Sequence, residues 1–114
     1  MKSPEVLRKQ EDFNNLYKKG KSSGSRHVVV IYKKNGLSFN RKAFLASKKV
    51  GNSVCRNRAR RLMREAFRKT EDKIPAGYDL LFIARHTITE TDAKCVNVER
   101  SMNNALERAG LLKK

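Results

Sequence analysis

The feature that most constrains the fold is an unbroken apolar run, DLLFIAR, at residues 79–85. A strand that is apolar on both faces must be covered on both faces. This run therefore predicts a central strand, with other elements packed above and below the sheet. Two more segments predict strands. HVVVIY at 27–32 is rich in β-branched residues, and AFLASK at 43–48 is a shorter apolar stretch.

Residues 53–70 predict a helix between the last two of these strands. Apolar residues recur there at helical spacing and would form the buried face: Cys55, Ala59, Leu62, Met63, Ala66 and Phe67. A strand, a helix and a further strand in this order form a βαβ unit, which implies one parallel strand pair.

Two more helices are predicted at the ends of the chain. The first spans Ser3–Gly20, with Ser3 as N-cap, Pro4 at the first helical position and a restart of the turn at Asp12 after a local break. The last begins at the capping-box spacing of residues 87–90 and runs to about Leu112. Its buried stripe is Val98, Met102, Ala105 and Ala109.

The connections complete the predicted architecture. Residues 21–25 read as a Ser/Gly loop, and Asn35-Gly36 as the turn of a hairpin between the strands at 27–32 and 43–48. The order is then α-β-β-α-β-α. We expect an α+β fold, an α/β sandwich with a mixed sheet, in a single domain over residues 1–114.

The charge of the chain indicates its partner. The 27 Lys and Arg residues against 11 Asp and Glu give a formal net charge of +16, which favours nucleic acid first and an anionic membrane second. Residues 41–68 hold ten of the basic residues and one acid, Glu65. Arg61, Arg64 and Arg68 repel one another along the helix unless an anion lies between them. Arginine also suits bidentate contacts with phosphate.

The start of this helix strengthens the prediction of an anion-binding surface. Gly51, Asn52 and Ser53 place free backbone N–H groups at the positive end of the helix dipole. Lys48 and Lys49 precede them at the end of a strand. The segment therefore reads as a receptor for a polyanion.

Several other functions are disfavoured by the sequence. Cys55 and Cys95 are isolated, so no metal site is expected. No secretory signal and no apolar run of membrane-spanning length is visible, and we expect a cytoplasmic protein. No paired carboxylates, His pair or phosphate-binding loop indicates a catalytic residue. The residues alone leave a basic RNA or DNA binder, with a ribosomal-type structural RNA-binding protein as one alternative. DNA is disfavoured because apolar strands, rather than a second helix across a tight turn, flank the basic helix.

Phe13 and Tyr17 allow two interpretations. They are four residues apart and share one helix face. The first interpretation places both in the core, as is usual for aromatic residues. The second places them at the edge of a groove, where they contact bases.

The segment KKVGNSVCRNRARRLMREAFR at 48–68 resembles the signature of the bacterial ribonuclease P protein subunit. The resemblance extends over nearly the whole chain, through LRKQEDFNNLYKKGK at 7–21, RHVVVIY at 26–32 and GYDLLFIAR at 77–85. It implies a small α/β sandwich with a left-handed βαβ crossover, against the usual right-handed rule. It also favours partial exposure of Phe13 and Tyr17.

The function implied by the resemblance is that of the non-catalytic protein subunit of an RNA-based endoribonuclease, which removes the 5′ leader of precursor tRNA. The RNA subunit would hold the active site and its Mg²⁺ ions. The resemblance implies that the ribonuclease P RNA is bound by Lys48, Lys49, Asn52, Arg56, Asn57, Arg58, Arg60, Arg61, Arg64 and Arg68. It implies a groove for the precursor-tRNA leader lined by Phe13, Tyr17, Val29, Ile31, Phe44 and Ala46.

Overall fold

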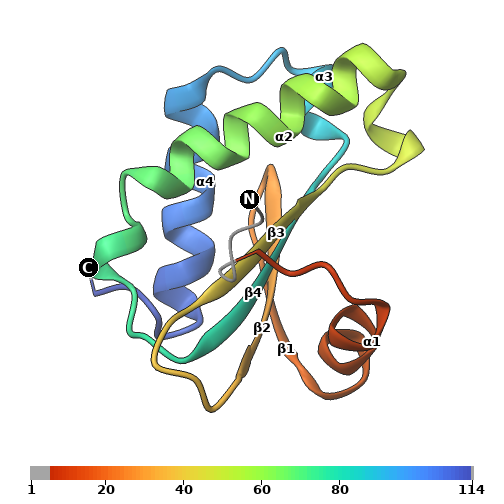
Figure 1. Cartoon of the computed structure of the whole chain (residues 1–114). Coiled ribbons are helices and arrows are strands. Elements are labelled where there is room, and N and C mark those ends of the chain that lie inside the picture. The colour runs from red at the N-terminus through yellow and green to blue at the C-terminus, as the bar shows by residue number, and fades with distance from the viewer. Residues whose placement is uncertain (1–5, 114) are drawn as a thin grey trace.

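The structure, a computed structural model, describes residues 6–113 and forms a four-stranded sheet with helices on both faces (Figure 1). Two single-turn 3₁₀ helices, η1 and η2, lie on either side of the basic helix. In chain order the elements are α1 (Gln10–Lys19), β1 (Lys21–Gly24), β2 (Val28–Lys34), β3 (Arg41–Leu45), η1 (Lys48–Val50), α2 (Ser53–Arg68), η2 (Glu71–Lys73), β4 (Tyr78–Ala84), α3 (Thr87–Glu90) and α4 (Cys95–Arg108).

The sheet has the strand order β1-β2-β4-β3. β4 pairs antiparallel with β2 and parallel with β3, so the predicted mixed sheet and βαβ unit are confirmed. The apolar run at 79–85 forms most of β4 and lies between two neighbours, as its composition predicts. The hand of the crossover stays an expectation from the resemblance.

One face of the sheet carries the main core, under α2 and α4. Val28, Val30, Leu80 and Phe82 point from the strands into this layer and are fully buried. Phe82 lies at its centre: its ring centroid is 4.8 Å from that of Phe67 on α2 and 5.4 Å from that of Phe44 on β3. These contacts fix the basic helix on the sheet.

The opposite face is covered by α1 and by the segment before it. Leu16 on α1 and Leu7 are buried against Ala43 and Leu81. This second, smaller layer covers only part of the face, and Ile31 and Ile83 beside it stay partly exposed. The incomplete cover leaves room for a groove.

The first helix is shorter than the sequence predicts. The proposed N-cap at Ser3 and Pro4 lies outside the described residues, and the helix begins at Gln10, beyond the local break. Val6 instead forms a parallel bridge with Lys42, and the Leu7 N–H donates to the Lys42 carbonyl at 2.9 Å. Because Leu7 is buried in this arrangement, the extended backbone beside β3 is favoured over a longer first helix. The predicted stop at Gly20 is confirmed.

Two predicted connections are wrong. The segment 21–25 is not a loop, because its KSSG portion forms the edge strand β1, held by backbone pairing with β2. The strands at 27–32 and 43–48 are not a hairpin, because β4 lies between them. The Asn35 side chain explains the turn: it accepts from the Leu37 N–H at 2.8 Å and donates to Asp79 of β4 at 2.9 Å.

The predicted last helix is divided in two. The turn at Thr87–Glu90 is a separate short helix, α3, and the chain then bends at Asp92, which has a φ of 47°. A new start follows at Lys94, whose N–H donates to the Asn97 side chain at 2.9 Å. The buried stripe is confirmed for Val98, Met102 and Ala105, while Ala109 lies beyond α4 and is partly exposed. Within the described residues, no helix is long and apolar enough to cross a membrane.

His27 couples the stability of this fold to pH. Its ring is buried, and Nδ1 lies 2.9 Å from Thr87 Oγ1. The Thr87 hydroxyl donates to the Arg26 carbonyl at 2.6 Å, so Nδ1 is the donor to Thr87. Burial, and secondarily the charge of Arg26, lower the pKa of His27 below the ordinary value of 6.5.

The folded state therefore favours neutral His27, and protonation favours unfolding. We expect the free energy of unfolding to be highest above pH 6.5 and to fall as the pH decreases below that value. Urea titrations at pH 7.5 and 5.5 measure the difference. His27→Gln, which cannot titrate, should reduce it. An equal pH dependence in both proteins would contradict the assignment.

Candidate nucleic-acid interface

The local structure at the start of α2 depends on two residues of the predicted anion-binding turn. The Asn52 side chain caps the helix by accepting from the Cys55 N–H at 3.0 Å. Gly51 has a φ of 138°, and a Cβ there would lie 2.9 Å from the Cys55 Cβ. Only glycine fits this position. Asn52, predicted to contact RNA, thus also has a structural role.

The cations of α2 divide between two flanks of the helix. On the flank toward α4, Arg58 donates to the Ala93 carbonyl at 2.6 Å and lies 3.5 Å from an Asp92 oxygen. Lys69 on the same flank pairs with Glu99 at 3.1 Å. Arg58 therefore holds the α3–α4 connection, and its predicted contact with RNA stays a prediction.

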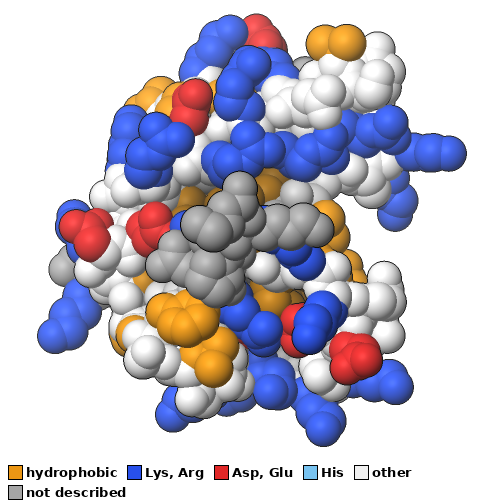
Figure 2. Space-filling view, viewed as in Figure 1, with side chains coloured by type: hydrophobic (Ala, Val, Ile, Leu, Met, Phe, Trp, Pro, Cys, Tyr) orange, Lys and Arg blue, Asp and Glu red, His pale blue; other side chains and the backbone are white. Residues whose placement is uncertain are grey.

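The opposite flank carries arginines that have no carboxylate within ion-pair distance among the described residues. Arg60 donates to the Asn57 side chain one turn earlier. Lys48 and Lys49 continue this surface, exposed on η1. Figure 2 shows basic side chains in a row along α2. We call this the arginine surface: Lys48, Lys49, Arg56, Asn57, Arg60, Arg61, Arg64 and Arg68.

A groove lies between α1 and the uncovered part of the sheet. The register places Val29 opposite Ile83, and Ile83 beside Leu45, so the three share one face. Phe13 of α1 is half-buried at the wall of the groove, and Tyr17 is 55% exposed. Figure 2 shows a notch in the surface between α2 and α1. The placement of Tyr17 matches the second of the two interpretations.

Two of the residues predicted to line this groove lie on the other face of the sheet. Phe44 is in register with Phe82 and Val30, and its ring stacks on Phe82 with an interplanar angle of 13°. Ala46 also packs against the main core. On β3 the groove face carries Ala43 and Leu45, and Phe44 contributes from the outer edge of this edge strand, where it lines a cavity beside Arg64. A shift of one residue reverses every side chain of a strand, and the apolar AFLA segment shows no alternation that fixes its parity.

The groove continues into the arginine surface. A cavity of about 330 Å³ lies between the segment before α1 and strand β3, and Arg64 of α2 forms part of its wall. The cavity is lined by Val6, Leu7, Phe13, Lys42, Ala43, Phe44, Leu45 and Arg64. One polyanion could therefore pass from the cationic helix to the apolar groove without leaving the protein surface.

Arg41 holds α1 in place beside the groove. Its guanidinium binds Asp79 of β4 through two bonds of 2.8 and 2.7 Å and Asp12 of α1 through two of 3.3 Å. The hydrogen bond with Asp79, opposed in part by burial, raises the pKa of Arg41. The sequence shows no signal for this network, because its members come from three distant segments.

Replacing Arg41 should loosen α1. Arg41→Met leaves Asp79, which is almost buried, without its cation, and we expect a loss of about 2–3 kcal/mol in the free energy of unfolding. Urea denaturation gives the value. Arg61→Met, on the exposed arginine surface, is the matched control and should change stability by less than about 0.5 kcal/mol. Equal effects would show that the ion network does not stabilise the fold.

Several carboxylates of the described residues are held by cationic or histidine side chains. Asp12 and Asp79 bind Arg41, Glu71 binds Lys42, and Glu90 lies against His86. Within residues 6–113, no three His, Cys, Asp or Glu side chains are grouped to hold a metal ion.

Comparison with known proteins agrees with this geometry. The family model described as Ribonuclease P matches residues 1–110. The "Ribonuclease P protein component" of Pelotomaculum thermopropionicum is 44% identical over 109 residues, covering 96% of each chain. That of Alkaliphilus oremlandii is 40% identical over 112 residues, covering 98% of this chain and 96% of the other.

Solved structures show the same fold. The RNase P protein of Staphylococcus aureus aligns with a TM-score of 0.85 at 30% identity, over 97% of this chain and 100% of that one. The RNase P protein of Thermotoga maritima aligns with a TM-score of 0.81 at 33% identity, over 91% and 96% of the two chains.

Proposed function

Because this chain belongs to the ribonuclease P protein family, we propose that it binds the catalytic RNA of ribonuclease P and the 5′ leader of precursor tRNA together. As a component of that endoribonuclease it takes part in tRNA processing. The observation that carries the proposal is the continuity of the arginine surface with the groove at Arg64.

In this proposal the arginine surface binds the catalytic RNA. Its guanidinium groups have no internal carboxylate partners among the described residues, so RNA phosphates would relieve their mutual repulsion. Each phosphate contact releases condensed counterions, and the affinity then falls steeply with salt. These cations contribute binding energy and fix the position of the RNA on the protein. They take part in no proton transfer.

The groove holds the single-stranded leader. Tyr17 and Phe13 offer rings against which bases pack, above a floor that includes Val29, Ile31 and Ile83. A protein that contacts both the catalytic RNA and the leader lessens the repulsion between two polyanions. It thereby reduces the Mg²⁺ concentration that the complex needs.

The chemistry of cleavage belongs to the RNA in this proposal. Mg²⁺ ions would supply the activated water and the stabilisation of charge on phosphate. They would be held by the RNA and the substrate, as is expected for a catalytic RNA. The protein's own residues bind and orient the two RNA molecules.

The complex of protein and catalytic RNA should distinguish precursor from mature tRNA. We expect it to bind precursor tRNA more tightly than a matched tRNA that lacks the leader, and the catalytic RNA alone to bind the two more equally. Filter binding at fixed salt measures both. No gain in discrimination on adding the protein would favour a purely structural RNA-binding protein.

Tyr17→Ala tests the groove. We expect affinity for precursor tRNA to fall roughly 5- to 100-fold, because base stacking on one ring contributes about 1–3 kcal/mol. Affinity for mature tRNA should not change. Tyr17→Phe keeps the ring and is the matched control. An equal loss for precursor and mature tRNA would remove Tyr17 from the leader groove.

A further inference from the structure

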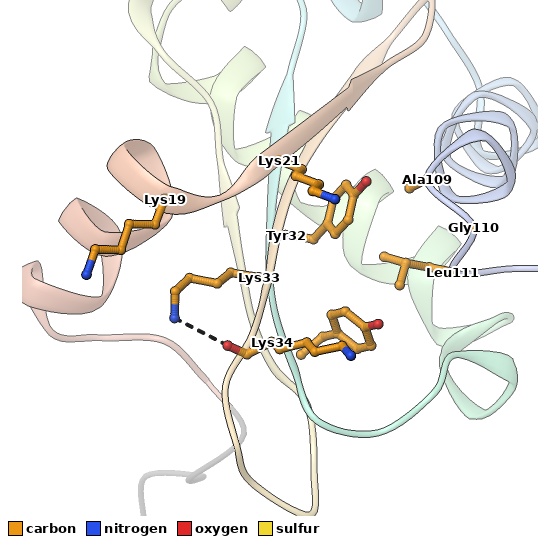
Figure 3. A pocket seen from close by; sticks show the side chains of 9 residues that line it. Lys19, Lys21, Tyr32, Lys33, Lys34, Ala109, Gly110 and Leu111 are labelled. Carbon is orange, nitrogen blue, oxygen red and sulfur yellow. Dashed lines mark hydrogen bonds between the residues drawn. The ribbon is translucent and has the colours of Figure 1, made fainter.

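A second basic pocket lies on the α4 side of the sheet. It has a volume of about 340 Å³ and lies between the ends of β1, β2 and β4 and the turn after α4 (Figure 3). Four lysines and two tyrosines contribute to its wall, and no acidic residue does. It is lined by Lys19, Lys21, Tyr32, Lys33, Lys34, Tyr78, Ala109, Gly110 and Leu111.

The strand register places lysine and tyrosine side by side twice. Lys21 of β1 is directly opposite Tyr32 of β2, and Lys34 of β2 is directly opposite Tyr78 of β4. Opposed residues in antiparallel strands have Cβ atoms about 4.5–5.5 Å apart. Figure 3 shows Lys21, Tyr32 and Lys34 on one side of the strand, facing Leu111, with Lys19 and Lys33 on the other side.

The turn after α4 closes the pocket. The Gly110 N–H donates to the Glu107 carbonyl at 3.0 Å, and the Leu111 N–H donates to the Leu106 carbonyl at 2.9 Å. Gly110 has a φ of 78°, so the chain reverses there and Leu111 packs as an apolar wall. These bonds also satisfy carbonyl groups at the negative end of the helix, which would otherwise oppose an anion.

The side chains of the pocket are available to a ligand. Tyr32 and Tyr78 are partly exposed, and Lys21 and Lys34 are exposed. None of the four lysines lies within ion-pair distance of a carboxylate among residues 6–113. The only recorded contact of a lysine head here is a 3.3 Å bond from Lys33 to the Lys34 carbonyl.

We propose that this lysine–tyrosine pocket is a second binding site for single-stranded nucleic acid. One base would stack on the part of the Tyr32 or Tyr78 ring that the core leaves uncovered, and the adjoining phosphates would lie at Lys21 and Lys34. The pocket is separate from the arginine surface, because α4 covers the β1 and β2 side of the sheet and α2 the β3 and β4 side. It is also separate from the groove, because Tyr32 pairs with Leu80 on the main-core face, whereas Val29 and Ile83 lie on the opposite face. The protein would therefore hold single strands on opposite faces of its sheet.

Photo-crosslinking locates such a site on the full-length protein without the catalytic RNA. A short oligouridylate that carries 4-thiouridine is irradiated with the protein, and the crosslinked peptides are identified by mass spectrometry. We expect crosslinks assigned to Tyr32 or Tyr78 themselves, in addition to any in α1, in α2 or at the groove residues Val29, Ile31 and Ile83 of the same strands. Crosslinks confined to α1, α2 and the groove would overturn the proposal.

Variants measure the contribution of the side chains to this crosslink. Lys21→Ala/Lys34→Ala should reduce the apparent affinity of the protein for the oligouridylate roughly 25-fold at 0.1 M salt, because each phosphate contact on a single strand contributes about fivefold. Lys73→Ala/Lys113→Ala removes the same charge elsewhere and should leave the affinity unchanged. Equal losses of affinity in both variants would show that net charge alone determines binding, and would contradict a specific site in the lysine–tyrosine pocket.

The stacking step has its own control. Tyr78→Phe keeps the ring at position 78 and should retain the crosslink to Tyr32. Tyr78→Ala/Tyr32→Phe removes that ring and keeps the one at position 32. It should weaken binding at least about fivefold if Tyr78 stacks on the base. Inorganic phosphate is the competitor for the lysines alone. If millimolar phosphate abolishes the crosslink as efficiently as unlabelled oligouridylate at equal phosphate concentration, base stacking plays no part and the site is only an anion site. These readouts are scored at Tyr32 and Tyr78, on the face of the sheet opposite the groove, so a negative result here leaves the proposed leader groove standing.

Discussion

Arg60→Ala/Arg61→Ala/Arg64→Ala is expected to weaken binding of the catalytic RNA roughly 100- to 500-fold at 0.1 M salt. The estimate follows from counterion release, which gives each lost phosphate contact a slope of about 0.7–0.9 in the logarithm of affinity against the logarithm of salt. The salt slope should therefore flatten by about 2–3. Titrations of the RNA with protein at several salt concentrations measure both quantities.

The matched control removes the same charge from another part of the surface. Lys73→Ala/Arg100→Ala/Lys113→Ala takes away three exposed cations that do not belong to the arginine surface. We expect only a small loss of affinity and little change in slope. Thermal unfolding of the free proteins separates binding from folding: removing like charges from α2 should leave its stability equal or higher. Equal losses of RNA affinity in the two triple variants would show that total charge, and not the arginine surface, determines binding.

Phe82→Ala is expected to have the largest effect on stability. Phe82 is fully buried and contacts the rings of Phe67 and Phe44, so its truncation leaves a cavity under α2. Such changes cost about 3–5 kcal/mol, which is a large part of the free energy of unfolding of a small domain. Urea denaturation followed by circular dichroism gives the value.

The conservative variant keeps this prediction measurable if the alanine protein does not fold. Phe82→Leu retains most of the volume and should cost less than half as much. Its RNA affinity should stay close to that of the original protein under conditions in which both are folded. A Phe82→Ala protein of undiminished stability would contradict the assignment of the aromatic cluster as the contact that fixes α2 on the sheet.

The elements that the sequence predicts well are those with long local patterns. The apolar run of β4 requires two covered faces, and the spacing of Ala59, Leu62, Met63, Ala66 and Phe67 fixes the buried side of α2. The first is a continuous apolar run and the second a helical repeat over several turns, so a local pattern decides the outcome in each. The arginine surface follows directly, because it is the remainder of the same helix.

The features that the sequence does not predict depend on partners distant in the chain. β1 is held by backbone pairing with β2 and by hydrogen bonds to α4, and its KSSG sequence carries no β-branched residue. The parity of Phe44 is decided by Phe82 across the sheet, and the position of Arg58 by Ala93 beyond β4. The Arg41 network joins α1, β3 and β4. None of these partners can be identified until the sheet order is known.

The measurement that tests the central claim most directly is cleavage of a 5′-labelled precursor tRNA at low Mg²⁺. It compares the protein alone, the matching catalytic RNA alone, and the two together. The account predicts efficient cleavage at the mature 5′ end only in the mixture, with the Arg60/Arg61/Arg64 variant defective at the same protein concentration. Cleavage by the protein alone, free of contaminating nuclease, would contradict the absence of a protein active site. No stimulation of the RNA by the protein would contradict its role as a ribonuclease P subunit.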